Sequence, residues 1–207
     1  DPFLPSSSDG GEQNNNIQFV KASAEEFIPR NDDGDMNKQD TEWKDGYNHI
    51  LLKEVVHHLD AKERVGIFTG LNIGLMNNDD ELKNIRSNDE DGASLLIITR
   101  PQIDIDYPMW PAAKDIWAAN QPSADEIEAD LRKAGFTEIQ RCIKSYPCEI
   151  TLNKWLDMVR NRFWSTFSHF SDVELDEGCD YMSKEAELDD DGKITFEERL
   201  VFITARR

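Results

Sequence analysis

Short apolar stretches recur along the chain and predict β-strands. The strongest is 93–99 (ASLLIIT), and a continuous apolar run of this length is typical of a strand buried on both faces, as in a parallel sheet. Weaker patterns of apolar residues predict further strands at 17–22, 47–52, 136–146, 193–196 and 200–204.

Helical patterns fall between the predicted strands. Residues 61–76 carry apolar side chains at a loose helical spacing, and 152–170 repeat them three and four positions apart. The segment 122–134 begins with Ser123 and Glu126, whose spacing is that of an N-terminal capping box. Strands and helices alternate through the first two thirds of the chain, so we expect one domain, 1–207, of the α/β class.

Charge narrows the range of partners. The 207 residues include 23 Lys and Arg against 42 Asp and Glu, a formal net charge of −19. Phosphates would be repelled, which argues against nucleic acid and anionic membranes as partners. No apolar run approaches the ~18 residues of a membrane span, and no secretory signal opens the chain. Cys142, Cys148 and Cys179 form no disulfide framework, so a reducing, cytoplasmic location is expected.

Polar side chains gather where predicted strands end. In open parallel sheets, ligands bind beyond the carboxyl ends of the strands. Here those ends are followed by 23–25, 53–58 and 100–107. A carboxylate at such a place suits the two hydroxyl groups of a ribose, because it accepts both protons.

Six segments together carry a resemblance to a known family. They are Asp1-Pro2, 22–27 (ASAEEF), 51–59 (LLKEVVHHL), 94–100 (SLLIITR), 134–136 (AGF) and 199–206 (RLVFITAR). In this order the chain resembles class I S-adenosylmethionine-dependent methyltransferases of the small-molecule branch called type 11. The last three segments are similar to its fifth strand, the turn into its sixth strand, and its last strand.

The resemblance implies a fold, an activity and a cofactor site. The fold would be the Rossmann-like methyltransferase sheet with helices on both faces. The activity would be transfer of a methyl group from S-adenosylmethionine to a small-molecule acceptor. Asp1 would bind the ribose of the cofactor, and Ser23, Ala24 and Glu25 would flank the adenine. The methionine part would lie beside three residues that follow the fourth strand, namely Lys53, Glu54 and Val55.

The resemblance also places an acceptor site. A helical insertion, 152–192, would cover the acceptor, and Arg160 and Arg162 could hold a carboxylate of it. Pairing of these arginines with surface acids is the alternative. Tyr107 and Trp110 could line the wall of the acceptor pocket, although core packing explains them equally well.

The adjacent histidines His57 and His58 are candidates for a general base, and a metal site is not expected from them. The chain departs from the family at its start, because the Gly-rich loop after the first strand is missing. We therefore expect the C-terminal portion of a methyltransferase, lacking the first strand unit and inactive as it stands. A methyltransferase-like scaffold without activity is the alternative.

A second alternative is a calcium-binding module. Residues 187–198 place acids at the first, third, fifth and twelfth positions of an EF-hand-like loop, with Gly192 at the sixth. An EF-hand requires a helix after this loop. The methyltransferase resemblance instead predicts a strand after Ile194, so the two hypotheses can be told apart.

Overall fold

The computed structural model describes residues 47–75 and 92–207. The strand predicted at 17–22 and the cofactor residues Asp1, Ser23, Ala24 and Glu25 lie outside the described residues. The described elements follow in chain order: β1 (His49–Lys53), the 3₁₀ helix η1 (Val56–His58), α1 (Arg64–Gly74), β2 (Ser94–Thr99), α2 (Pro111–Asn120), α3 (Ala124–Lys133), β3 (Glu138–Thr151), α4 (Leu152–Arg160), the 3₁₀ helix η2 (Ser165–His169), α5 (Asp172–Glu185) and β4 (Lys193–Arg206).

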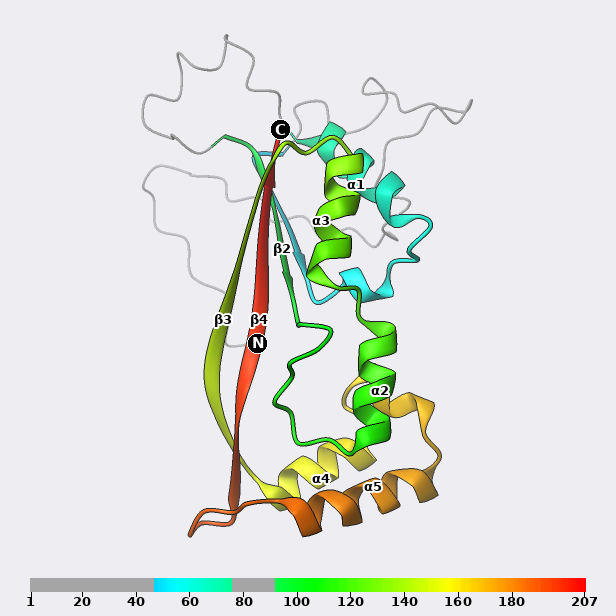
Figure 1. The fold of residues 1–207 in the computed structure, drawn as a ribbon, viewed down its shortest axis with the longest axis vertical. Coiled ribbons are helices and arrows are strands. Elements are labelled where there is room, and N and C mark those ends of the chain that lie inside the picture. The colour runs from blue at the N-terminus through cyan, green and yellow to red at the C-terminus, as the bar shows by residue number, and fades with distance from the viewer. Residues whose placement is uncertain (1–46, 76–91) are drawn as a thin grey trace, which may run out of the picture.

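The described strands form one open, mixed sheet in the order β1-β2-β4-β3. β1 and β2 are parallel, with Lys53 opposite Ile98. β4 is antiparallel to both of its neighbours, β2 and β3. Helices connect the strands, so the predicted α/β class is confirmed. Within the described ranges, α1 and α3 lie together on one side of the sheet (Figure 1).

Several helices and strands begin or end at residues other than those predicted from the sequence. The two strands predicted near the C-terminus are one continuous strand, β4. The helix predicted over 152–170 ends at Arg160, because Arg162 takes a left-handed backbone conformation (φ 51°), and η2 follows. The strand predicted to end at Tyr146 runs on to Thr151. β2 is buried at alternate positions only, not on both faces, in the part of the chain that the structure describes.

Two hydrophobic clusters divide the molecule. The first packs α1 and α3 against β2 and the C-terminal half of β4. Its fully buried members include Phe68, Leu95, Leu131 and Ile203. The second lies among α2, α4, η2 and α5 and includes Trp110, Trp155, Val159 and Phe167. We call these helices, together with the adjoining segments 107–110 and 161–164, the helical part. In Figure 1 the long β3–β4 ribbon runs from the sheet down to this helical part.

β4 serves both clusters by changing the face that it buries. Ile194 and Phe196 are buried near its start, and Val201 and Ile203 are buried further on, so the buried positions change from even to odd. The pairing with β3 has no interruption over this stretch. The right-handed twist of a long two-stranded ribbon produces such a change without a bulge. Between the two stretches, Glu197–Leu200 are only half-buried.

None of the helices at 47–75 and 92–207 has both the length and the apolar character that a membrane span requires.

Candidate functional site

The carboxyl ends of β1 and β2 lie side by side at one edge of the sheet. The backbone N–H of Glu54, directly after β1, donates to the carbonyl of Ile98 at 2.9 Å, which keeps the two ends together. The segment that follows β2 descends from this edge to α2 in the helical part (Figure 1). This edge of the sheet, at which ligands are expected to bind, therefore faces the helical part.

Arg100 is the first residue after β2 and connects several elements at this edge. Its guanidinium forms ion pairs with Glu54, after β1, and with Glu198 of β4, the latter at 2.9 Å from Nη2 to Oε1. Its Nε also donates to the hydroxyl of Tyr107 at 2.9 Å. The guanidinium carbon lies 5.6 Å from the centre of the Trp164 ring, within cation–π range.

A cavity of about 340 Å³ opens beside this ion pair. Its lining consists of Lys53, Glu54, Arg100, Tyr146, Glu198 and Leu200. Two of these, Lys53 and Glu54, are residues that, by the family resemblance, would lie beside the methionine part of a cofactor. The third, Val55, is 39% exposed and does not line this cavity.

Glu54 has two unusual features. Its backbone is in the left-handed region (φ 57°), which is uncommon for a residue other than glycine and tends to occur at functional sites. Its Oε1 atom is buried and has no hydrogen-bond partner among the described residues. An acceptor oxygen without a donor is unfavourable in a folded protein, and since Glu54 also lines the cavity, its carboxylate is a candidate contact for a ligand.

Tyr107 belongs to the wall behind this site. Its side chain is only 2% exposed. Burial is the main cause that raises the pKa of Tyr107 to about 12, and the positive charge of Arg100 opposes the shift. The phenol is therefore neutral at any physiological pH, and it donates to Glu198 at 3.4 Å. Tyr107 thus supports Arg100 and Glu198, and it does not itself line this cavity.

The two histidines lie on η1, just after β1, and do not line the cavity. Their rings are 4.0 Å apart. His57 is half-buried, and its Nδ1 is buried with no hydrogen-bond partner among the described residues. Burial, and then the charge of His58, lower the pKa of His57 below its ordinary value of 6.5. The general-base role of either histidine stays a prediction.

This lowered pKa predicts a pH-dependent stability. The unfolded chain binds a proton at His57 more readily than the folded chain does, so the contribution of this group is complete above pH ~6.5 and is lost as the pH falls below it. We expect the free energy of unfolding, measured in urea, to fall between pH 7.5 and 5.5, and the fall to be smaller in His57→Gln. His169→Gln, which makes the same change at an exposed position, is the matched control. An undiminished fall in His57→Gln would contradict the prediction.

Three predicted acceptor residues lie away from the cavity. Trp110 is 7% exposed and packs in the helical part against Phe167 and Phe170. Arg160 pairs with Asp176 at 3.0 Å. Arg162 pairs with Asp172 at 2.7 Å. In the structure, therefore, the tryptophan packs in a core and the two arginines pair with surface acids. These are the contacts given above as the alternatives to an acceptor site.

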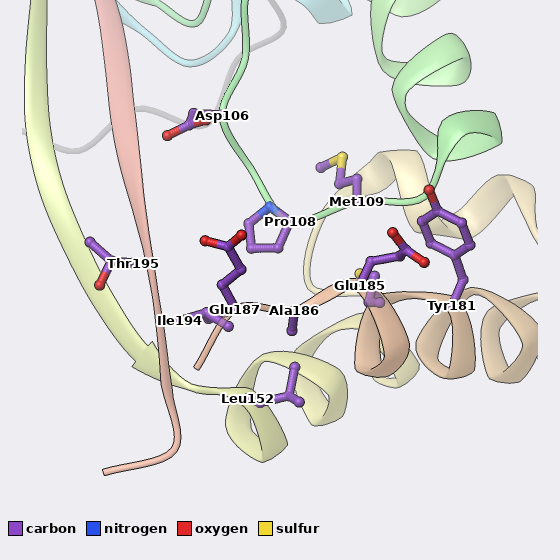
Figure 2. Close-up of a pocket in the computed structure, with 11 residues that line it drawn as sticks. Asp106, Pro108, Met109, Leu152, Tyr181, Glu185, Ala186, Glu187, Ile194 and Thr195 are labelled. Carbon is purple, nitrogen blue, oxygen red and sulfur yellow. The ribbon is translucent and has the colours of Figure 1, made fainter. Parts of the chain in front are cut away.

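A second, smaller cavity of about 200 Å³ lies in the helical part. Figure 2 shows it between the segment before α2, the end of α5 and the start of β4. Its lining combines apolar side chains, among them Pro108 and Met109, with the carboxylates of Glu185 and Glu187. A third carboxylate, Asp106, accepts a hydrogen bond from the backbone N–H of Glu197 at 2.9 Å, and so also fixes the course of β4.

The loop 187–198 does not have the geometry of an EF-hand. β4 begins at Lys193 and continues through Ile194, so a strand stands where the calcium hypothesis requires a helix. The Asp189 carboxylate instead accepts from the backbone N–H groups of Asp191 and Lys193, at 2.9 and 2.8 Å, and closes a tight turn. No group of three or more potential metal-binding side chains occurs within 47–75 and 92–207.

Sequence reasoning missed Arg100 and Glu198 as site residues. Arg100 could have been identified from the sequence, because it directly follows the most apolar strand, where ligand-binding residues are expected. Glu198 was noticed only as the twelfth position of the supposed calcium loop. The two residues are 98 positions apart in the sequence, so no local signal indicates their pairing.

No protein-family model and no curated protein matches the chain. Among solved structures, it is similar to a proposed methyltransferase from Bacillus halodurans, at 14% identity and a TM-score of 0.43, over 78% of this chain and 64% of that one. The YcgJ protein from Bacillus subtilis has 14% identity and a TM-score of 0.39 over the same shares. Phosphoethanolamine N-methyltransferase 2 from Haemonchus contortus, solved with phosphomonomethylethanolamine and S-adenosylhomocysteine, has 11% identity and a TM-score of 0.36, over 78% of this chain and 34% of that one. The chain therefore spans less than two thirds of each of these proteins.

Proposed function

We propose that the protein transfers a methyl group from S-adenosylmethionine to a small-molecule acceptor. One observation carries the proposal: a cavity lies at the carboxyl ends of the adjacent parallel strands β1 and β2 and is lined by Lys53 and Glu54. Ligands of open α/β sheets bind at this edge. The resemblance places the methionine part of the cofactor beside the same two residues.

The chemistry of Glu54 fits this part of the cofactor. A carboxylate is the natural partner of the ammonium group of a methionine, through a charge-assisted hydrogen bond. Glu54 Oε1 is buried and lacks a donor among the described residues, which such an ammonium would supply. When bound, the sulfonium group of the cofactor supplies an electrophilic methyl carbon. The residues of the chain would orient the acceptor and exclude water.

The helical part is proposed to cover the acceptor, as expected for 152–192. The carboxyl edge of β1 and β2 faces it (Figure 1). The wall that it offers beside Arg100 is aromatic, formed by Tyr107 and Trp164. Asp1, Ser23, Ala24 and Glu25, as ligands of the ribose and adenine, stay predictions.

Calorimetric titration of S-adenosylhomocysteine into the protein, extended by any natural residues upstream of Asp1, tests the proposal. We expect saturable binding with one site per chain. Glu54→Gln should weaken the dissociation constant by about tenfold or more, because it removes the charge of the proposed contact. The matched control is Glu149→Gln, which removes the same charge from an exposed position on β3 and should leave the affinity unchanged.

The outcomes separate the proposals. Absence of binding by the folded protein would contradict methyl transfer and favour a methyltransferase-like scaffold without activity. Binding that Glu54→Gln and Glu149→Gln affect equally would keep the cofactor but remove Glu54 from its site.

A further inference from the structure

Arg100 lies where the sheet edge, the β3–β4 ribbon and the helical part meet. Its ion pair with Glu54 ties it to the end of β1, and its ion pair with Glu198 ties it to β4. The hydroxyl of Tyr107 and the ring of Trp164 contact it from the helical part. We infer that Arg100 is a positioning residue that holds the Glu54 carboxylate in its ligand-binding orientation and fixes it relative to the helical part. The inference rests on the proposed function and names a residue that the resemblance did not assign.

The guanidinium group suits this role because of its shape. It is planar and presents five N–H donors in fixed directions, so one side chain can contact two carboxylates and a hydroxyl at once. Its flat face stacks well over an indole ring. A lysine carries the same charge as a single point on a flexible stem and cannot make these contacts together.

The ion pairs of Arg100 are partly buried and differ in this from ion pairs on an open surface. The side chains of Arg100, Glu54 and Glu198 are 20%, 23% and 26% exposed, so water screens them only in part. One cation stands between two carboxylates, and without it those carboxylates would repel each other across the cavity.

The contacts also settle which oxygen of Glu54 is used. Arg100 binds Oε2, and Oε1 is left without a protein partner in the described part of the chain. The carboxylate is therefore held by one oxygen, and the other has no protein donor to satisfy it. Arg100 acts through Glu54 and does not need to touch a ligand itself.

A double-mutant cycle on S-adenosylhomocysteine affinity tests this mechanism. Arg100→Gln should weaken binding by about tenfold, and Arg100→Lys should recover only part of that loss. In the Glu54→Gln background, Arg100→Gln should have little further effect, because its route of action is already removed. Independent, additive losses would overturn the inference, since a general structural role would weaken binding in both backgrounds.

A second measurement works without any ligand. Side-chain NMR of Glu54 should show one fixed rotamer in the wild type and an averaged one in Arg100→Gln. The control is Arg141→Gln, which removes an arginine of β3 that pairs with Asp125 and Glu128 of α3, and it should leave the Glu54 rotamer unchanged. A Glu54 rotamer that stays fixed in Arg100→Gln would overturn the inference. If the wild type fails to bind S-adenosylhomocysteine, the proposed function is wrong, and this NMR result still decides whether Arg100 positions Glu54.

Discussion

Replacing Asp130 with alanine is expected to lower the free energy of unfolding by about 3–5 kcal/mol, the usual effect of removing one partner from a buried ion pair. Asp130 of α3 accepts a hydrogen bond from Arg64 Nε of α1 at 2.7 Å, and the two side chains are 9% and 7% exposed. Without the carboxylate, the guanidinium of Arg64 would stay buried between the helices as an uncompensated charge. Urea denaturation measures the loss directly.

The same pair predicts how acid destabilises the protein. Burial acts to raise the pKa of Asp130, but hydrogen bonds and charges from Arg64 and Lys133 outweigh it and hold the pKa below its ordinary value of 3.8. A carboxyl whose pKa is lower in the folded state contributes stability above the pKa of the unfolded state. This contribution is therefore complete above pH ~4 and is lost as the pH falls further, and Asp130→Ala should lack this part of the acid transition.

Two controls separate charge from packing. Lys133 contacts the other oxygen of Asp130 at 3.1 Å, but its side chain is 65% exposed, so Lys133→Ala should change the stability by only about 0–1 kcal/mol. The double variant Arg64→Met with Asp130→Leu should be near wild type, because apolar groups of similar volume replace both charges. If Asp130→Ala proved no worse than Lys133→Ala, the pair would not be the buried contact between α1 and α3 that the structure shows.

Local signals explain which helices the sequence predicted. α3 begins with both hydrogen bonds of a capping box. The backbone N–H of Glu126 donates to the hydroxyl oxygen of Ser123, and the backbone N–H of Ser123 donates to the carboxylate of Glu126. That motif needs only four consecutive residues, so no tertiary information is required to find it. α5 begins with the same motif at Ser171 and Glu174, but the sequence prediction included this helix only within the helical insertion 152–192 and did not give its bounds. Its buried stripe is narrow within a strongly acidic segment, and the apolar pattern alone did not reveal it.

Strand position was easier to predict than strand length or pairing. β1 and β2 are short apolar runs in the chain and were found as such. The change of buried face within β4 breaks the simple alternation of apolar and polar residues, which made one strand look like two. A twisted ribbon that serves two separate clusters is a property of the assembled fold, and no local pattern encodes it.

The candidate site was predictable only in part, for the same reason. Lys53 and Glu54 follow a strand, and a rule about strand ends combined with a family resemblance finds them. Arg100, Glu198 and Trp164 converge from three separate segments, and only the register of β4 beside β2 brings Glu198 to that edge. For Trp110 the sequence left a pocket wall and core packing open, and in the structure its indole packs against the backbone of α5 at Gly178.

The close approach of Trp110 to α5 depends on Gly178. A Cβ atom added at Gly178 would lie 2.6 Å from Cδ2 and 2.7 Å from Cε3 of the Trp110 indole. The indole has little room to retreat, because it is buried in the helical part and stacks on Phe167 with ring centres 5.9 Å apart. Gly178→Ala must therefore move a rigid side chain within a packed cluster, which typically destabilises by about 1–3 kcal/mol.

We expect a net loss of about 1–2 kcal/mol for Gly178→Ala, because alanine returns up to about 1 kcal/mol through its better helix propensity. Gly66→Ala on α1 isolates the effect of helix propensity, because no atom of the described residues lies within 4 Å of its added Cβ. It should stabilise the protein by about 0.5–1 kcal/mol. The urea concentration at the midpoint of unfolding should fall in Gly178→Ala and rise in Gly66→Ala. Adding Trp110→Leu to Gly178→Ala should cost less than Trp110→Leu alone, since the smaller side chain makes room for the new methyl group. Movement of both midpoints in the same direction would show that the contact between Trp110 and α5 is looser than the structure has it, and would return Trp110 to consideration as a pocket residue.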